Sequence, residues 1–227
     1  MAHPGHRPGP KTRRHQCRAR DRNLFFGGIE AWRHGGFAYS GLLWSPDGLD
    51  REGFVLKSLI GGGTYRYRSG DLAIDGYHAV LSLMPGWRFK RNGFETSVFV
   101  GADAQFHYLF PDDPESRLRG LRAGPRLGVD FWLEPVPSAM INGFATFSTI
   151  GHSYAVRGAL GWRFFESVYL GPEAQATGST DYRQFRFGVH ATSLTIGPYE
   201  FSAGAGYIRD SDQRGGLYGR FGVLKRQ

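Results

Sequence analysis

The sequence predicts an all-β protein, a closed antiparallel transmembrane β-barrel of about 12 strands, with a range of roughly 10 to 14. From Leu24 onward, apolar residues recur with a period of two rather than 3.6, in segments of about ten or more residues that end at turn residues. The chain has 34 glycines, 18 phenylalanines, 11 tyrosines and 5 tryptophans, but no run of about 18 apolar residues. A membrane-spanning helix is therefore excluded, and a barrel of amphipathic strands is favoured.

Turn residues divide the first half of the chain into six expected strands. His34-Gly35 joins the first pair, Ser69-Gly70-Asp71 joins the third and fourth, and the loop Pro111–Ser116 separates the fifth and sixth. Arg91-Asn92-Gly93 is the clearest hairpin signal, because Asn and Gly both tolerate the positive φ of a type I′ turn. The six segments are Asn23–Arg33, Gly36–Ser45, Glu52–Arg68, Leu72–Lys90, Gly93–Phe110 and Arg117–Glu134.

The second half continues in the same way after the PVP stretch at 135–137. Near Leu194–Pro198 the apolar positions change from odd, as at Phe187 and Val189, to even, as at Leu194 and Ile196, which predicts a bulge or turn. The six segments are Ser138–Gly151, Tyr154–Phe165, Ser167–Thr177, Tyr182–Thr192, Tyr199–Arg209 and Gly216–Leu224.

Each strand has an apolar face and a polar, glycine-rich face. A soluble sandwich or a lipocalin-like barrel would turn the apolar face inward, whereas a membrane barrel turns it towards lipid. Rows of six or seven apolar positions, aromatic residues at row ends such as Tyr154 and Phe164, and tight turns that alternate with longer connections favour the membrane barrel. We therefore expect Leu127, Val129, Phe131 and Leu133 to face outward and Arg122, Arg126 and Asp130 to face inward.

Charged residues on the polar faces are expected to line the lumen. We interpret them as a structural salt-bridge network or a selectivity lining rather than a specific ligand site. Glu173 is expected to pair with an inward arginine of a neighbouring strand, Arg186 or Arg157, because a partly desolvated carboxylate needs a partner, and to serve rigidity rather than catalysis. The candidate lumen residues are Asp103, Arg122, Arg126, Asp130, Arg157, Glu173 and Arg186.

The first 22 residues differ in composition from the rest. They carry six of the chain's eight net positive charges, so the remainder is nearly neutral and a nucleic-acid partner is not expected. We expect residues 1–22 to be a disordered basic segment, or sequence upstream of the mature protein, and residues 23–227 to form a single barrel domain. As written, this segment lacks the apolar region of a secretory signal, and its Cys17, the only cysteine, is expected to be incidental.

No catalytic signature is present in the sequence. The eight histidines are scattered over the chain, and the set Ser153, His152 and Glu173 is disfavoured because adjacent residues on one strand point to opposite faces. We therefore expect no enzyme activity, no cofactor and no metal site.

Several stretches resemble one known family. They are LFFGGIEAW, PDDPESRLRG with LRAGPRLG, YLGPEAQATGSTDYRQFRFGVH, AGYIRD and GGLYGRFG, and together they are similar to the cellulose biosynthesis protein BcsS family of bacterial outer-membrane β-barrels over about residues 24 to 224. The most specific positions are Asp112, Asp113, Pro114, Arg117, Arg119, Gly120, Gly171, Pro172, Glu173, Ala174, Asp181, Tyr182 and Arg183.

The resemblance implies a non-catalytic accessory of cellulose synthesis and export in the bacterial outer membrane. Its candidate partners are outer-membrane lipid, a glucan chain and other cellulose-synthesis components. The alternative is a general porin for small solutes, although bulky side chains could largely fill a lumen of about 12 strands. An even strand number places both termini in the periplasm, so Arg91-Asn92, Pro135–Pro137 and Glu166-Ser167 become periplasmic turns and Ser69–Asp71, Pro111–Ser116 and Gly178–Asp181 lie outside.

Overall fold

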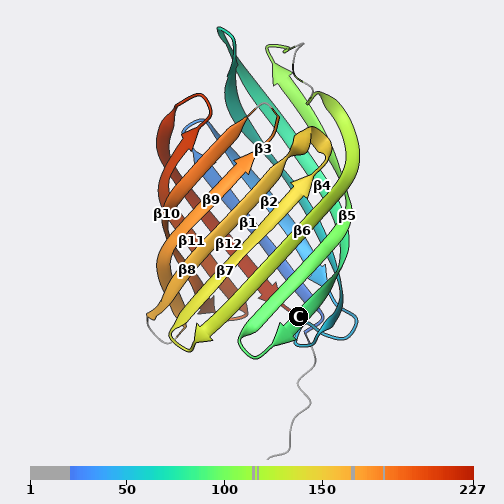
Figure 1. Cartoon of the computed structure of the whole chain (residues 1–227), viewed down its shortest axis with the longest axis vertical. Helices are drawn as coiled ribbons and strands as arrows, with labels where there is room; N and C mark the ends of the chain where they lie inside the picture. The colour runs from blue at the N-terminus through green and yellow to red at the C-terminus, as the bar shows by residue number, and fades with distance from the viewer. Residues whose placement is uncertain (1–20, 114–115, 117, 165–166, 181) are drawn as a thin grey trace, which may run out of the picture.

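The computed structural model describes residues 21–113, 116, 118–164, 167–180 and 182–227. Within these residues, twelve strands form one closed antiparallel barrel in which each strand pairs with its neighbours in the chain and β12 pairs with β1 (Figure 1). The predicted fold class is therefore confirmed. The strands are β1 (Asn23–Trp32), β2 (Gly35–Trp44), β3 (Gly53–Ser69), β4 (Leu72–Arg91), β5 (Phe94–Phe110), β6 (Gly120–Val136), β7 (Ala139–Ser148), β8 (Tyr154–Phe164), β9 (Val168–Gly178), β10 (Arg183–Ile196), β11 (Tyr199–Asp210) and β12 (Gly215–Arg226).

The two faces of the strands have the polarity of a membrane barrel. On β5 the outward Val100 and Phe106 are 60% and 50% exposed, whereas the inward Asp103 is 3% exposed. On β6, Leu127 is half exposed, and Arg126 lies on the opposite face and pairs with an inward residue of β5. Among the described residues, no helix is long and apolar enough to cross a membrane.

The barrel wall is much taller on one side than on the other. Strands β1 and β2 have 10 residues each, whereas β4 has 20 and its neighbours β3 and β5 have 17. A tilted strand rises about 2.5 Å per residue, so β1 and β2 just span an apolar band about 25 Å tall. The β3–β4 and β5–β6 hairpins project beyond the rest of the wall at one end of the barrel, which we call the extended end (Figure 1).

The two described chain ends meet at the opposite end of the barrel, the terminal end. The Arg22 and Asn23 amides both donate to the Gln227 carbonyl at 2.7 Å. Both ends of the chain therefore lie on one side of the barrel, as an even number of strands requires.

Two predicted strand ends beside the loops of the extended end differ clearly from the structure. The segment Arg117–Glu134 begins as a strand only at Gly120, whose φ is +71°. The segment Ser138–Gly151 ends as a strand at Ser148, and Ile150–His152 instead form a 3-10 turn. In both cases the outward apolar row has already stopped, because Arg119 and Thr149 occupy the next odd-numbered positions beyond Leu121 and Phe147.

The turns lie where the sequence predicts them, but one of them differs from the prediction in its type. The Asn92-Gly93 hairpin is present, but only Gly93 has a positive φ, whereas a type I′ turn needs positive φ at both residues. The predicted irregularity near Leu194 is confirmed as a bulge, because the β10–β11 register shifts between Ala191 and Leu194 and Ser193 has a φ of +64°. Consequently β10 runs on to Ile196 instead of ending at Thr192.

Candidate functional site

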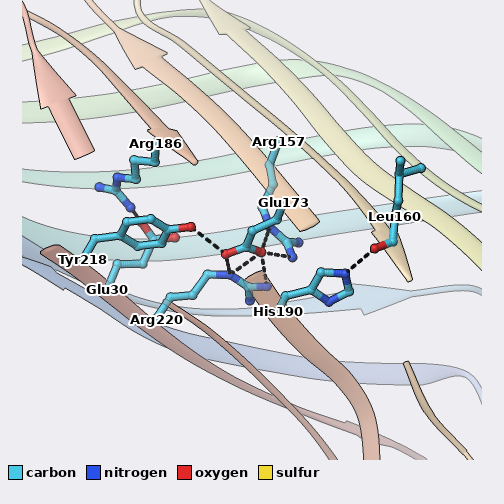
Figure 2. Close-up of polar contacts among 8 residues, drawn as sticks. All are labelled: Glu30, Arg157, Leu160, Glu173, Arg186, His190, Tyr218 and Arg220. Atoms are coloured by element: carbon cyan, nitrogen blue, oxygen red, sulfur yellow. Dashed lines mark hydrogen bonds and ion pairs between the residues drawn. The ribbon is translucent and has the colours of Figure 1, made fainter. Parts of the chain in front are cut away.

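The buried carboxylate of Glu173 is the centre of a charged network inside the barrel (Figure 2). Glu173 is 3% exposed, on β9. Arg157 on β8 donates from Nη2 to Glu173 Oε2 at 2.8 Å, and Arg220 on β12 donates from Nη2 to the same oxygen at 2.5 Å. The Tyr218 hydroxyl donates to Glu173 Oε1 at 2.9 Å. The expected Glu173–Arg157 pair is thus present, and Arg220 and Tyr218 are partners that the sequence did not identify.

Two glycines allow β12 to reach Glu173 across two intervening strands. The register places Gly188 of β10 directly opposite Glu173, so no side chain separates the carboxylate from the lumen there. On β11, a Cβ at Gly204 would lie 2.3 Å from Glu173 Oε1 and 2.8 Å from Arg220 Nε. The absence of both side chains leaves the space in which Arg220 and Glu173 meet.

Arg186, the other arginine that the sequence offered as a partner for Glu173, does not pair with it. Its Nη1 donates to Glu30 Oε2 of β1 at 2.5 Å, and its guanidinium lies 4.6 Å from the Trp32 ring centroid and 5.5 Å from that of Tyr218. Its register partner on β9 is Gln175 rather than Glu173. Arg186 is 1% exposed, so a carboxylate and two aromatic faces replace the water that this cation loses.

Asp103, on β5, is the centre of a second cluster of inward side chains. Arg126 Nη1 donates to Asp103 Oδ2 at 2.9 Å, the Gln105 amide donates to the same oxygen at 2.6 Å, and the Ser148 hydroxyl donates to Oδ1 at 2.9 Å. Three donors on one buried carboxylate fix its position, which supports a structural role for this cluster.

Asp130 forms an ion pair with Lys57, a partner that the alternation pattern does not indicate. Lys57 Nζ of β3 lies 2.6 Å from Asp130 Oδ2 and 5.1 Å from the Phe99 ring centroid. Strands β3 and β6 are three positions apart in the barrel, so this pair crosses part of the lumen.

Arg122, by contrast, is exposed near the extended end and makes no ion pair with any described residue. It is therefore not part of the paired lumen network that the sequence predicted. Of the missed residues, Glu30 did carry a signal, because it is the only charged residue of β1, whereas Arg220 shares β12 with Lys225 and Arg226.

Tyrosine and aspartate residues hold the loops at the extended end. The Tyr67 hydroxyl donates to Asp113 Oδ2 at 2.7 Å, and the Tyr182 hydroxyl donates to Asp210 at 3.4 Å. Burial, followed by the nearby Asp210, raises the pKa of the Tyr182 hydroxyl above its usual range. Asp113 is only 6% exposed, so it is an anchor for its loop.

The remaining family-motif residues have separate positions. Arg119 forms an exposed pair with Asp112 at 2.9 Å, and Arg183 begins β10. Gly171 lies where a Cβ would meet the Leu160 carbonyl oxygen at 2.0 Å, and Pro172 lies on the outward face beside it. The motif positions Pro114, Arg117 and Asp181, together with residues 1–20, lie outside the described residues.

The residues considered for catalysis are not brought together. His152 lies in the 3-10 turn at the extended end, whereas Glu173 lies in the middle of β9 and its carboxylate binds two arginines. No group of three or more His, Cys, Asp or Glu that could hold a metal ion occurs in the described part of the chain.

Two solved outer-membrane barrels are similar in structure to this chain. The outer membrane channel of the COG4313 group from Pseudomonas putida F1 is 10% identical, with a TM-score of 0.60 over 96% of this chain and all of that one. The KdgM porin is 13% identical with a TM-score of 0.47, over 89% of this chain and 98% of that one. The first likeness shows an outer-membrane barrel fold and nothing about activity.

No curated protein sequence matches the chain. The family model of cellulose biosynthesis protein BcsS, however, matches residues 24–227, which is the whole barrel except its first residue. The chain therefore belongs to the BcsS family of cellulose biosynthesis proteins.

Proposed function

We propose that the protein is a non-catalytic outer-membrane accessory of cellulose biosynthesis whose lumen is closed by its own side chains. The family match supports the link to cellulose, and the outward apolar face supports a place in the outer membrane. The observation that carries the closed lumen is the network around Glu173 and Arg186, which joins β8 and β9 to β12 and joins β10 to β1.

Contacts at other levels of the barrel support the same conclusion. Lys57 and Asp130 join β3 to β6, and the rings of Tyr65 and Tyr182 lie 6.2 Å apart although β3 and β10 are five positions apart. A solute on the barrel axis would have to separate these pairs, and separating a buried ion pair is costly. A glucan chain is therefore not expected to pass through the lumen, so the protein would act through the surfaces at its two ends.

Conductance measurements test the closed lumen. The purified protein in a planar lipid bilayer should give no large, steady conductance. The double variant Glu30→Ala with Arg186→Ala removes both partners of one pair, so it leaves no unpaired buried charge, and it should conduct measurably. Arg66→Ala with Asp75→Ala removes an exposed outward pair and serves as the matched control, without conductance. A large, steady conductance of the unaltered protein would instead support a porin.

Two further measurements test the accessory role. Deletion of the gene should lower cellulose output, measured as glucose released by cellulase from washed cells, and the unaltered protein should restore it. The purified barrel should release no new reducing ends from cello-oligosaccharides. Unchanged cellulose after deletion would remove the accessory role, and new reducing ends would make the protein an enzyme.

A further inference from the structure

The outer wall of the barrel has a groove of about 520 Å³ across β12, β1, β2 and β3. Outward side chains beside it stand well clear of the wall, since Ile29 is 58% and Ile60 is 62% exposed. Between them, small residues leave the surface hollow. The outward residues that line the groove include Gly27, Ile29, Ala38, Ser40, Ile60 and Phe221.

Five arginines gather at the extended end above this groove. The β11–β12 turn reaches over the short β1–β2 hairpin to β3: Arg214 Nη2 donates to the Arg66 carbonyl at 2.6 Å, and the Arg68 amide donates to Asp212 Oδ2 at 2.9 Å. The segments that flank the top of the groove are therefore in contact. The arginine cluster consists of Arg33, Arg66, Arg68, Arg209 and Arg214.

The arginine cluster has more positive charge than its acidic partners offset. Three aspartates lie within it: Arg66 pairs with Asp75 at 2.5 Å, and Arg214 pairs with Asp210 at 2.8 Å and with Asp212 at 3.0 Å.

The other three arginines, Arg33, Arg68 and Arg209, make no ion pair among the described residues. Burial, then the charges of Arg214 and Arg33, lower the pKa of His34 in the β1–β2 turn. Three arginine charges, those of Arg214, Arg33 and Arg66, act on this turn against one aspartate, Asp210, and this excess of positive charge favours an anion.

The spacing of groove and cluster matches one leaflet of a bilayer. Arg66 lies six residues beyond Ile60 on the same face of β3, a rise of about 15 Å along the barrel axis, whereas half of an apolar band about 25 Å tall is about 12 Å, so Arg66 lies at the level of the headgroups. We propose that this wall binds a phosphate-bearing membrane lipid, with an acyl chain in the groove and the phosphate at the arginine cluster.

A lipid fits this surface better than a second copy of the chain does. Two copies in the same membrane orientation that shared the groove would bring their arginine clusters to the same level, where the excess positive charges repel each other. An anionic headgroup neutralises that excess instead. The site is also independent of whether the lumen is closed, because all of these residues lie on the outer wall or its rim.

Native mass spectrometry of the delipidated barrel, titrated with phosphatidylglycerol or phosphatidylcholine, tests the proposal. Phosphatidylglycerol should bind at least about tenfold more tightly than phosphatidylcholine. Arg68→Gln with Arg209→Gln removes two cations that have no ion-pair partner and should weaken phosphatidylglycerol binding about thirtyfold, since each arginine near an anionic surface contributes on the order of 1 kcal/mol. Ala38→Leu fills the groove and should weaken binding of both lipids.

The matched control is Arg51→Gln with Arg91→Gln, which removes two exposed arginines from the terminal end and should leave lipid binding unchanged. Inorganic phosphate at the same concentration should not displace the lipid, because it lacks the chain that the groove holds. Unchanged phosphatidylglycerol binding in both the arginine and the groove variants overturns the proposal. A dimer that Ala38→Leu converts to a monomer, with no change in bound lipid, makes the groove an interface between copies and also overturns it.

Discussion

At the scale of single residues, the lumen is held by carboxylates that each have more than one donor. Glu173 accepts from Arg157, Arg220 and Tyr218, and Asp103 accepts from Arg126, Gln105 and Ser148. Several donors per carboxylate offset desolvation better than one pair does, because each oxygen lone pair that loses water finds a partner. We therefore expect these residues to contribute rigidity to the wall.

Glu173→Gln should lower the stability of the detergent-solubilised barrel by about 3 kcal/mol, because it leaves two buried arginines without a carboxylate. Adding Arg157→Gln should cost less than the sum of the two single changes, since the pair is already broken. Thermal unfolding followed by circular dichroism measures both, with the exposed Glu52→Gln as control. If Glu173→Gln retains full stability yet cells lose cellulose output, Glu173 is a functional contact and the structural role is wrong.

Gly204→Ala should also destabilise the barrel, by about 1 to 3 kcal/mol, because its Cβ would lie 2.3 Å from Glu173 Oε1 in a fully packed site. Gly219→Ala is the matched control on the neighbouring strand, where a Cβ meets nothing within 4 Å. Equal stability of the two variants in the same unfolding assay would show that the carboxylate moves aside freely.

At the scale of elements, strand length divides the barrel into a short wall and a tall one. Strands β1 and β2 end where the apolar band ends, so turns at 33–34 lie near the membrane surface, whereas β3–β6 carry their loops farther out. The short wall carries the groove and the arginine cluster, and the tall wall carries the Asp112–Arg119 loop.

Cysteine labelling of intact cells tests the expected orientation. Asp113, in the loop expected outside, is 6% exposed and bound by Tyr67, so a cysteine there is unsuitable for labelling. In a Cys17→Ser background, Asp71→Cys at the exposed β3–β4 turn should react with an impermeant maleimide on intact cells, because the extended end is expected outside. Asn92→Cys at the terminal end should react only after lysis. The opposite pattern would reverse the orientation.

At the scale of the whole molecule, pairing between β1 and β12 closes the barrel, so free strand edges remain where β3 and β6 extend beyond their shorter neighbours β2 and β7. The register from Leu24 with Arg226 to Trp32 with Tyr218 is unbroken, so all of β1 is paired on both sides. Where the barrel is closed, no edge is left at which unfolding can begin without breaking a full ladder, which makes such proteins resistant to detergent.

Closure can be tested by gel mobility in sodium dodecyl sulfate. The unheated protein should migrate faster than the heated protein because it remains compact. Val223→Pro removes a ladder hydrogen bond at the β1–β12 seam and should abolish the difference between the two samples, whereas Val223→Ala should retain it. Retention of the difference in the proline variant would show that this seam is not needed for closure.

The sequence by itself determined the fold class, the strand order, the polarity of the two faces and the bulge near Leu194, because alternation with period two and local turn residues are properties of neighbouring residues. It also placed Arg126, Asp130 and Glu173 in the lumen. Only the tertiary structure decided the partners. Because the barrel wall is curved, Arg220 contacts Glu173 across the space at Gly204, and Arg186 contacts Glu30. Each of these pairs joins strands three positions apart in the barrel, and the pattern of residues along the chain does not reveal such contacts.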